Sequence, residues 1–175
     1  MAQLPYLVYE QKPPMSSEDF RELARPLMNK PDFALLNLLS LEPQTETTGC
    51  SFIDGWRDWE LDLRKNLAKQ RAIKLKRDLP VPEPVFHMDI AAVALKAIDE
   101  PSPLEGEILL DKARWLAVDA LAGNDYFHRN SVFAYLLKLL LIERRQIFNV
   151  EKGFAEYKSL YASIMESVQN VGDPK

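Results

Sequence analysis

PLEGEILLDKARWLAVDALAG (residues 103–123) and SVFAYLLKLLLIERRQIF (residues 131–148) are the two stretches that decide the fold class of this chain. Apolar residues of the first stretch recur at the three- to four-residue period of a helix, and residues 132–142 of the second form an apolar run that only Lys138 interrupts. Proline opens the first stretch and glycine closes it, which suits the first turn and the end of a helix. We expect Asn130 or Ser131 to cap the second helix.

A sparse set of charges lies inside these apolar stretches. Glu107, Asp111 and Arg114 share one stripe of the first helix, and Lys138 interrupts the second. A buried charge without a partner is costly, so we expect Lys138 to pair with Glu107 or Asp111 across two antiparallel helices. The alternative is an acid–base site, which we favour less because a cation beside two neighbouring carboxylates simply relieves their repulsion.

The rest of the chain predicts more helices and no sheet. Leu4 to Tyr9 is expected to be a short extended segment, and residues 79–86 form a proline-rich connector. The predicted fold is therefore all-α, with six or seven helices in a compact bundle. We expect one domain over residues 1–175, with a smaller half at 1–78 and a helical half at 87–175. The expected helices cover residues 16–26, 32–40, 54–77, 88–98, 103–123 and 130–148, with a last helix after residue 149 that carries Phe154, Tyr157, Leu160, Tyr161 and Ile164.

Composition limits the classes of function. The chain has 175 residues, a net charge of −4 and one cysteine, Cys50. An acidic total charge gives no general attraction to nucleic acid or to anionic membranes. No secretion signal and no apolar run of the ~20 residues that span a bilayer are recognisable. We expect a cytoplasmic protein without direct membrane insertion.

One predicted helix is locally basic between residues 64 and 77. A face of such a helix could follow nucleic-acid phosphates, but only some of the charges align. We therefore favour a docking surface for an acidic protein, formed by five of them, and keep a regulatory or nucleic-acid-binding module as the alternative. The five are Arg64, Lys65, Lys69, Lys76 and Arg77; Arg71 and Lys74 complete the basic stretch.

Signatures of catalysis are missing from the sequence. It has no glycine-rich phosphate loop and no nucleophile elbow, so we expect no catalytic residues, no cofactor and no small-molecule substrate. The two histidines, His87 and His128, lack the spacing that aims two ligands at one metal ion. We expect a protein that acts by binding.

Several stretches in a fixed order carry a resemblance to a known family. They are Glu10–Phe20, Leu63–Ala72, Glu107 with Asp111, Arg114 and Trp115, Tyr126–Phe127, Tyr135, Leu137–Leu139, Glu143–Arg144 and Gly153. Together they resemble uncharacterised bacterial proteins encoded among the subunits of V-type (A/V-like) rotary ATPases, in the gene position of the C subunit, called d in eukaryotes. The resemblance implies a helical, non-catalytic subunit whose partners are the membrane rotor ring and the central shaft. It also implies a peripheral location at the inner membrane.

Overall fold

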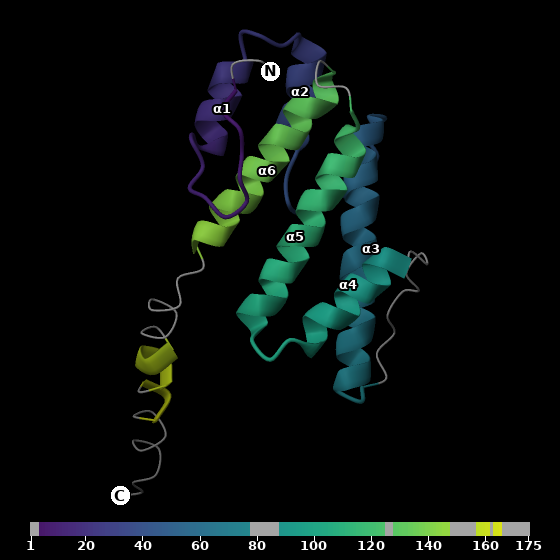
Figure 1. Ribbon diagram of the computed structural model, residues 1–175, viewed down its shortest axis with the longest axis vertical. Helices are drawn as coiled ribbons and strands as arrows, with labels where there is room; N and C mark the ends of the chain where they lie inside the picture. Colours follow the sequence, from purple (N-terminus) through teal and green to yellow (C-terminus); the bar gives the residue numbers. More distant parts are fainter. Residues whose placement is uncertain (1–3, 78–87, 125–127, 148–156, 162, 166–175) are drawn as a thin grey trace, which may run out of the picture. The chain divides into compact units, whose positions relative to one another are not determined.

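The computed structural model of the chain describes residues 4–77, 88–124, 128–147, 157–161 and 163–165. All regular secondary structure in these residues is helical, which confirms the predicted all-α fold. Residues 157–161 and 163–165 are also helical. The other helices, labelled in Figure 1, are α1 (Ser17–Ala24), α2 (Lys30–Leu38), α3 (Ser51–Lys74), α4 (Met88–Asp99), α5 (Pro103–Ala122) and α6 (Arg129–Ile147).

The chain divides into two compact units, residues 1–142 and residues 143–175. The prediction of one domain, with halves on either side of residues 79–86, stays a prediction. Helix α3 packs against both α4 and α5, so the two predicted halves share a core. The division falls within α6, where the apolar run of residues 132–142 gives way to three charged residues. The connector at 79–86 lies outside the described residues.

Local sequence signals set most helix ends. The Asp19 N–H donates to Ser16 Oγ at 3.0 Å, and the Ser16 N–H donates back to the Asp19 carboxylate at 3.4 Å, so these two residues form a capping box at the start of α1. Helix α6 starts earlier than predicted. Ser131 N–H donates to the His128 carbonyl at 3.0 Å, which places both predicted caps, Asn130 and Ser131, inside the first turn.

Helix α3 begins without a side-chain cap at Cys50, and Asp54 organises the preceding loop instead. The Thr48 N–H, the Thr48 hydroxyl and the Gly49 N–H donate to its carboxylate at 2.8, 3.0 and 3.0 Å. These bonds, above all the one from the Thr48 backbone, hold the pKa of Asp54 below its usual value. The carboxylate therefore stays ionised at the start of the helix, where negative charge is favourable.

Two apolar clusters form the core of residues 4–142. In the larger one, Phe20 of α1 lies against Tyr135 of α6, and Phe52 of α3 lies against Phe133, with ring centroids 4.9 and 5.8 Å apart. The extended N-terminal segment joins this cluster, because the Tyr135 hydroxyl donates to the Pro5 carbonyl at 3.0 Å. The smaller cluster fills the space between α3, α4 and α5, which Figure 1 shows side by side; its members are Leu63, Leu67, Ile90, Ala94 and Leu110.

Helices α4 and α5 approach unusually closely at Gly106. A Cβ atom on this residue would lie 2.7 Å from the Ala97 carbonyl oxygen, closer than real contacts allow. Glycine is therefore required here by packing. The close approach fixes α4 against the first turns of α5, and so builds one wall of the cleft described below.

Candidate functional site

A buried ion network joins α5 to α3. The Arg114 guanidinium donates to both carboxylate oxygens of Glu60, at 2.9 and 3.1 Å, and to Asp111 at 2.9 Å. Glu60 is fully buried and Arg114 is only 5% exposed. Paired donation to one carboxylate is the strongest and most directional form of ion pair. The network therefore holds the two helices in one register.

A second arginine extends this network. Arg64, one turn after Glu60 on α3, donates to Glu60 at 2.9 Å and pairs with Glu42 at 2.9 Å, so two arginines meet three carboxylates. Burial by itself lowers the pKa of Arg114, but the hydrogen bonds and charge of Glu60, with those of Asp111, outweigh it and raise the pKa overall. Burial lowers the pKa of Arg64 in the same way, and its hydrogen bonds with Glu42 and Glu60 again raise the pKa overall, so both arginines remain cations.

Glu60 is the member that sequence reasoning missed. It stands at i+4 from Trp56 and three residues before Leu63, within the apolar stripe of α3. A lone carboxylate in an apolar stripe indicates a buried ion pair, just as the lone charge of Lys138 in its apolar run does. Asp111 and Arg114, which the sequence places on one stripe of α5, are both buried and form an ion pair at 2.9 Å.

Lys138 has a different partner from the one predicted. Its ammonium pairs with Asp119, near the end of α5, and lies 4.6 Å from the ring centroid of Trp115. The antiparallel helix was correctly identified, but the pairing with Glu107 or Asp111 is wrong. Asp119 is eight residues beyond Asp111, about 12 Å along the helix axis. Helix spacing alone predicts which residues share a stripe, whereas the register of α6 on α5 depends on the whole core.

Glu107 lies in a cleft between α3 and the junction of α4 with α5. The cleft has a volume of about 380 Å³; Leu67 and Leu110 line it, and Arg71 stands on the α3 side. Lys74 Nζ donates to the Ile98 carbonyl at 2.5 Å, which ties α3 to the end of α4. The cleft therefore combines an apolar lining with charges of both signs.

The five residues predicted to form a docking surface differ in their exposure and in their ion pairs. Arg64 pairs with Glu60 and, at 2.9 Å, with Glu42, and Lys65 lies 3.7 Å from Asp62, so carboxylates of this chain already neutralise both cations. Lys69 is half-buried, with its own interactions inside the chain. Lys76 and Arg77 lie beyond the last helical residue, Lys74, and are exposed.

The exposed cations gather where α3 ends, in a patch that we name the basic end of α3. Two apolar residues within it, Ile73 and Leu75, are 62% and 60% exposed. An exposed apolar pair surrounded by cations is typical of a surface that binds an acidic partner with apolar side chains. The basic end of α3 consists of Arg71, Ile73, Lys74, Leu75, Lys76 and Arg77.

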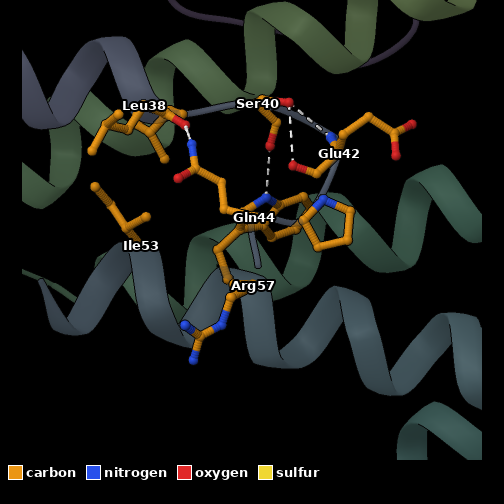
Figure 2. Close-up of a pocket in the computed structure, with 9 residues that line it drawn as sticks. Leu38, Ser40, Glu42, Gln44, Ile53 and Arg57 are labelled. Atoms are coloured by element: carbon orange, nitrogen blue, oxygen red, sulfur yellow. Dashed lines mark hydrogen bonds between the residues drawn. The ribbon is translucent and has the colours of Figure 1, made fainter. Parts of the chain in front are cut away.

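A second hollow lies between the loop after α2 and the first turns of α3, and Figure 2 shows the residues that line it. The Gln44 amide donates to the Leu38 carbonyl at 2.5 Å, and Ser40 Oγ accepts from the Glu42 N–H at 2.9 Å. The remaining space is about 10 Å³. That volume holds no more than about one water molecule, so this hollow is a structural feature of the loop.

The residues with metal or thiol chemistry are the two histidines and the single cysteine. His128 is exposed before α6, Cys50 is buried in the core, and His87 lies outside the described residues. Within the described ranges, no three His, Cys, Asp or Glu side chains come together as a metal site would require. None of the helices described here is long and apolar enough to cross a membrane.

Comparison with known proteins identifies one family, described as "Protein of unknown function (DUF2764)", whose sequence model matches residues 92–168. No curated protein and no solved structure matches the chain. The matched segment contains Asp111, Arg114 and Lys138 but neither Glu60 nor the basic end of α3. The chain is thus similar to this family over most of α4, all of α5 and α6, and the helical residues that follow.

Proposed function

We propose that this chain is a non-catalytic subunit or accessory protein of a bacterial V-type rotary ATPase, similar in role to the C/d subunit. Its sequence resemblance suggests the complex, and the basic end of α3 supports binding as its mode of action. In this role the chain couples the central shaft to the membrane rotor ring, at the cytoplasmic side of the inner membrane.

The observation that carries the proposal is the position of exposed cations at the end of a helix held rigidly along its length. Helix α3 has 24 residues, which corresponds to a length of about 36 Å. The Glu60–Arg114 pair fixes its middle, and the Lys74 bond to Ile98 fixes its end. A surface held in this way loses little conformational entropy when it binds, which favours affinity.

The second candidate function is a small regulatory or nucleic-acid-binding helical module. The basic end of α3 favours it, since Arg71, Lys74, Lys76 and Arg77 lie within seven residues. The neutralisation of Arg64 and Lys65 by neighbouring carboxylates argues against it, because it shortens the row of cations that could follow a phosphate backbone. Cations at only one end of the helix are enough to bind an acidic protein, whereas a nucleic-acid backbone would need a longer row of them. The first proposal therefore fits this surface better.

The test is co-purification of the tagged full chain with the ATPase rotor, followed by association kinetics with the isolated rotor. Arg71→Glu with Arg77→Glu should slow association about tenfold or more and flatten its salt dependence, because charge steering acts on the on-rate. Lys12→Glu with Lys30→Glu makes the same charge change at other exposed positions and should have little effect.

Two results would contradict the proposal. Failure of the wild-type chain to associate with the rotor would remove the ATPase role. Tight, salt-sensitive binding to duplex DNA or RNA at physiological ionic strength would favour the alternative module.

A further inference from the structure

The cleft between α3 and the junction of α4 with α5 adjoins the basic end of α3. Arg71 and Lys74 belong to both, since they line the cleft and are exposed near the end of the helix. They stand three residues apart, so their side chains share one face of α3. A partner that binds the basic end of α3 therefore also meets this cleft.

Contacts on each side hold the cleft in shape. Gly106 approaches the Ala97 backbone so closely that no Cβ atom fits, and Lys74 Nζ donates to a carbonyl at the end of α4 at 2.5 Å. Leu67 and Leu110, which line the cleft, are buried members of the smaller apolar cluster. Binding sites are largely formed before their ligand arrives, and this cleft needs no rearrangement to receive a side chain.

The size and lining of the cleft suit one apolar side chain. Its volume is about 380 Å³, which about a dozen water molecules would fill. That space does not hold a whole helix, which is about 10–12 Å across with its side chains. Release of water from an apolar lining favours the entry of an apolar group. The apolar residues of the lining are Leu67, Ala97, Ile98, Pro101, Pro103 and Leu110.

The charges around the cleft decide the class of partner. The α3 side carries Arg71 and Lys74, whereas the side formed by α5 and the residues just before it carries Glu100 and Glu107. A uniform polyanion, such as a nucleic-acid backbone or an anionic membrane, would meet these two carboxylates and be repelled. A polypeptide presents different groups to the two sides, and its carboxylates belong on the α3 side, where the other cations of the basic end follow.

Both cations of the cleft have donors for a carboxylate of the partner. Among the residues that the structure describes, no carboxylate pairs with Arg71 or Lys74, whereas Arg64 pairs with two. An ammonium group has three N–H donors, and the carbonyl at the end of α4 uses one of those of Lys74. The planar guanidinium of an arginine can hold a carboxylate by two parallel bonds. Carboxylates of a partner therefore complete the charge pairing on this side.

We propose that an acidic segment of the partner protein places one large apolar side chain in this cleft while its carboxylates pair with Arg71 and Lys74. The inference rests on the proposed function, because the partner is the protein that binds the basic end of α3. It adds that the segment has a leucine, isoleucine, methionine or phenylalanine beside two or more acidic residues. The charges speed the encounter, and the buried side chain slows dissociation.

The first test uses the full, isotope-labelled chain and a synthetic peptide, blocked at both ends, in which glutamates flank one leucine. Titration followed by NMR should shift the amide signals of Ala97, Gly106 and Leu110 until they saturate. A control peptide with serine in place of leucine should bind about tenfold more weakly or less, because it lacks the apolar anchor. Equal affinity of the two peptides, or no shift at these signals, would overturn the proposal. Vesicles containing phosphatidylglycerol that displace the peptide would also overturn it, since a membrane would then occupy the cleft.

The second test fills the cleft. Ala97→Leu adds bulk to its lining, and Ala92→Leu makes the same change at an exposed position of the same helix. Ala97→Leu should weaken the Kd for the leucine peptide and for the isolated rotor about tenfold, through faster dissociation, and leave the salt dependence unchanged; Ala92→Leu should alter neither. The peptide comparison needs no variant, so it tests the proposal even if thermal unfolding shows that Ala97→Leu does not fold.

The two tests separate this inference from the proposed function. A rotor that binds the wild-type chain and folded Ala97→Leu equally well would overturn the role of the cleft and leave the ATPase role standing. A rotor that does not bind, with a peptide that still requires its leucine, would overturn the ATPase role and support the cleft as a site for an acidic segment of another protein.

Discussion

Helix α5 contacts the rest of the molecule differently before and after the step from Arg114 to Trp115, so below we call residues 103–114 its first half and residues 115–122 its second half. In the first half, Gly106 lies directly against the α4 backbone and Arg114 makes a buried pair with Glu60 of α3. In the second half, Trp115 and Asp119 meet Lys138 through their side chains. The first half is fixed by steric fit and desolvated charge, so it should tolerate substitution far less than the second.

An open cleft of about 380 Å³ lies beside the middle of α5, and Val8 and Tyr9 of the N-terminal segment line it together with Trp115 and Leu116. The ring of Tyr9 meets Trp115 edge to face, with centroids 5.7 Å apart. A cleft of the same volume lies beside Gly106 and Glu107, so the difference between the halves depends on buried charge and steric fit and not on open space.

The largest expected effect comes from removing the buried cation. Arg114→Ala should lower the free energy of unfolding by about 3–5 kcal/mol, because Glu60 would remain buried without its partner. Replacing Glu60, Asp111 and Arg114 together by Leu, Leu and Met should recover much of the loss. Urea titration of the three proteins measures both effects. A loss below about 1 kcal/mol for Arg114→Ala would show that water enters the network and that the two halves of α5 do not differ as described.

The next largest effect tests steric fit in the same half of the helix. Gly106→Ala places a methyl group 2.7 Å from the Ala97 carbonyl oxygen, and overpacking of this kind costs about 1–3 kcal/mol. Gly55→Ala is the matched control, because its Cβ would meet only the end of a flexible side chain, Leu121 Cδ2, at 2.8 Å. Thermal unfolding should rank Gly106→Ala clearly below Gly55→Ala; equal midpoints would contradict a close approach at Gly106.

A smaller loss is expected in the second half of α5. Lys138 is 18% exposed in its side chain and Asp119 is 51% exposed, so solvent screens their attraction. Lys138→Ala should therefore cost no more than about 1 kcal/mol, including its contact with the Trp115 ring. Added salt should reduce the difference between the two proteins, whereas the Arg114→Ala difference should persist. A cost of several kcal/mol for Lys138→Ala would remove the distinction between the halves.

The sequence predicted the ends of the helices better than the contacts between side chains of neighbouring helices. Pro103 and Gly123 bound α5 as expected, because proline and glycine act on the local backbone. The partner of Lys138 could not be predicted, since the register of α6 against α5 depends on packing by distant residues such as Phe20 and Phe52.

The basic stretch shows the same limit for the candidate site. Its composition indicated a docking surface, but the carboxylates that neutralise Arg64 come from Glu60 and from Glu42 in a loop more than 20 residues earlier. A linear sequence does not reveal that proximity. The docking surface stays a prediction: Arg64 and Lys65 pair with carboxylates of this chain, whereas Arg71, Lys74, Lys76 and Arg77 are exposed.

The smallest effect concerns the basic end of α3, which lies outside the comparison of the two halves of α5. Lys76 has a φ of 50°, and the Arg77 N–H donates to the Ala72 carbonyl at 3.0 Å, so the helix ends in a turn that favours glycine at residue 76. Lys76→Gly should raise the free energy of unfolding by up to about 1 kcal/mol, because it removes a side chain from a left-handed conformation. Lys76→Ala is the control for loss of charge and should not stabilise the protein.

Because this turn forms part of the proposed docking surface, Lys76→Gly should also weaken rotor association slightly while the fold becomes more stable. A destabilised Lys76→Gly protein would mean that the lysine side chain supports the turn, and the basic end of α3 would then be held by more than its backbone.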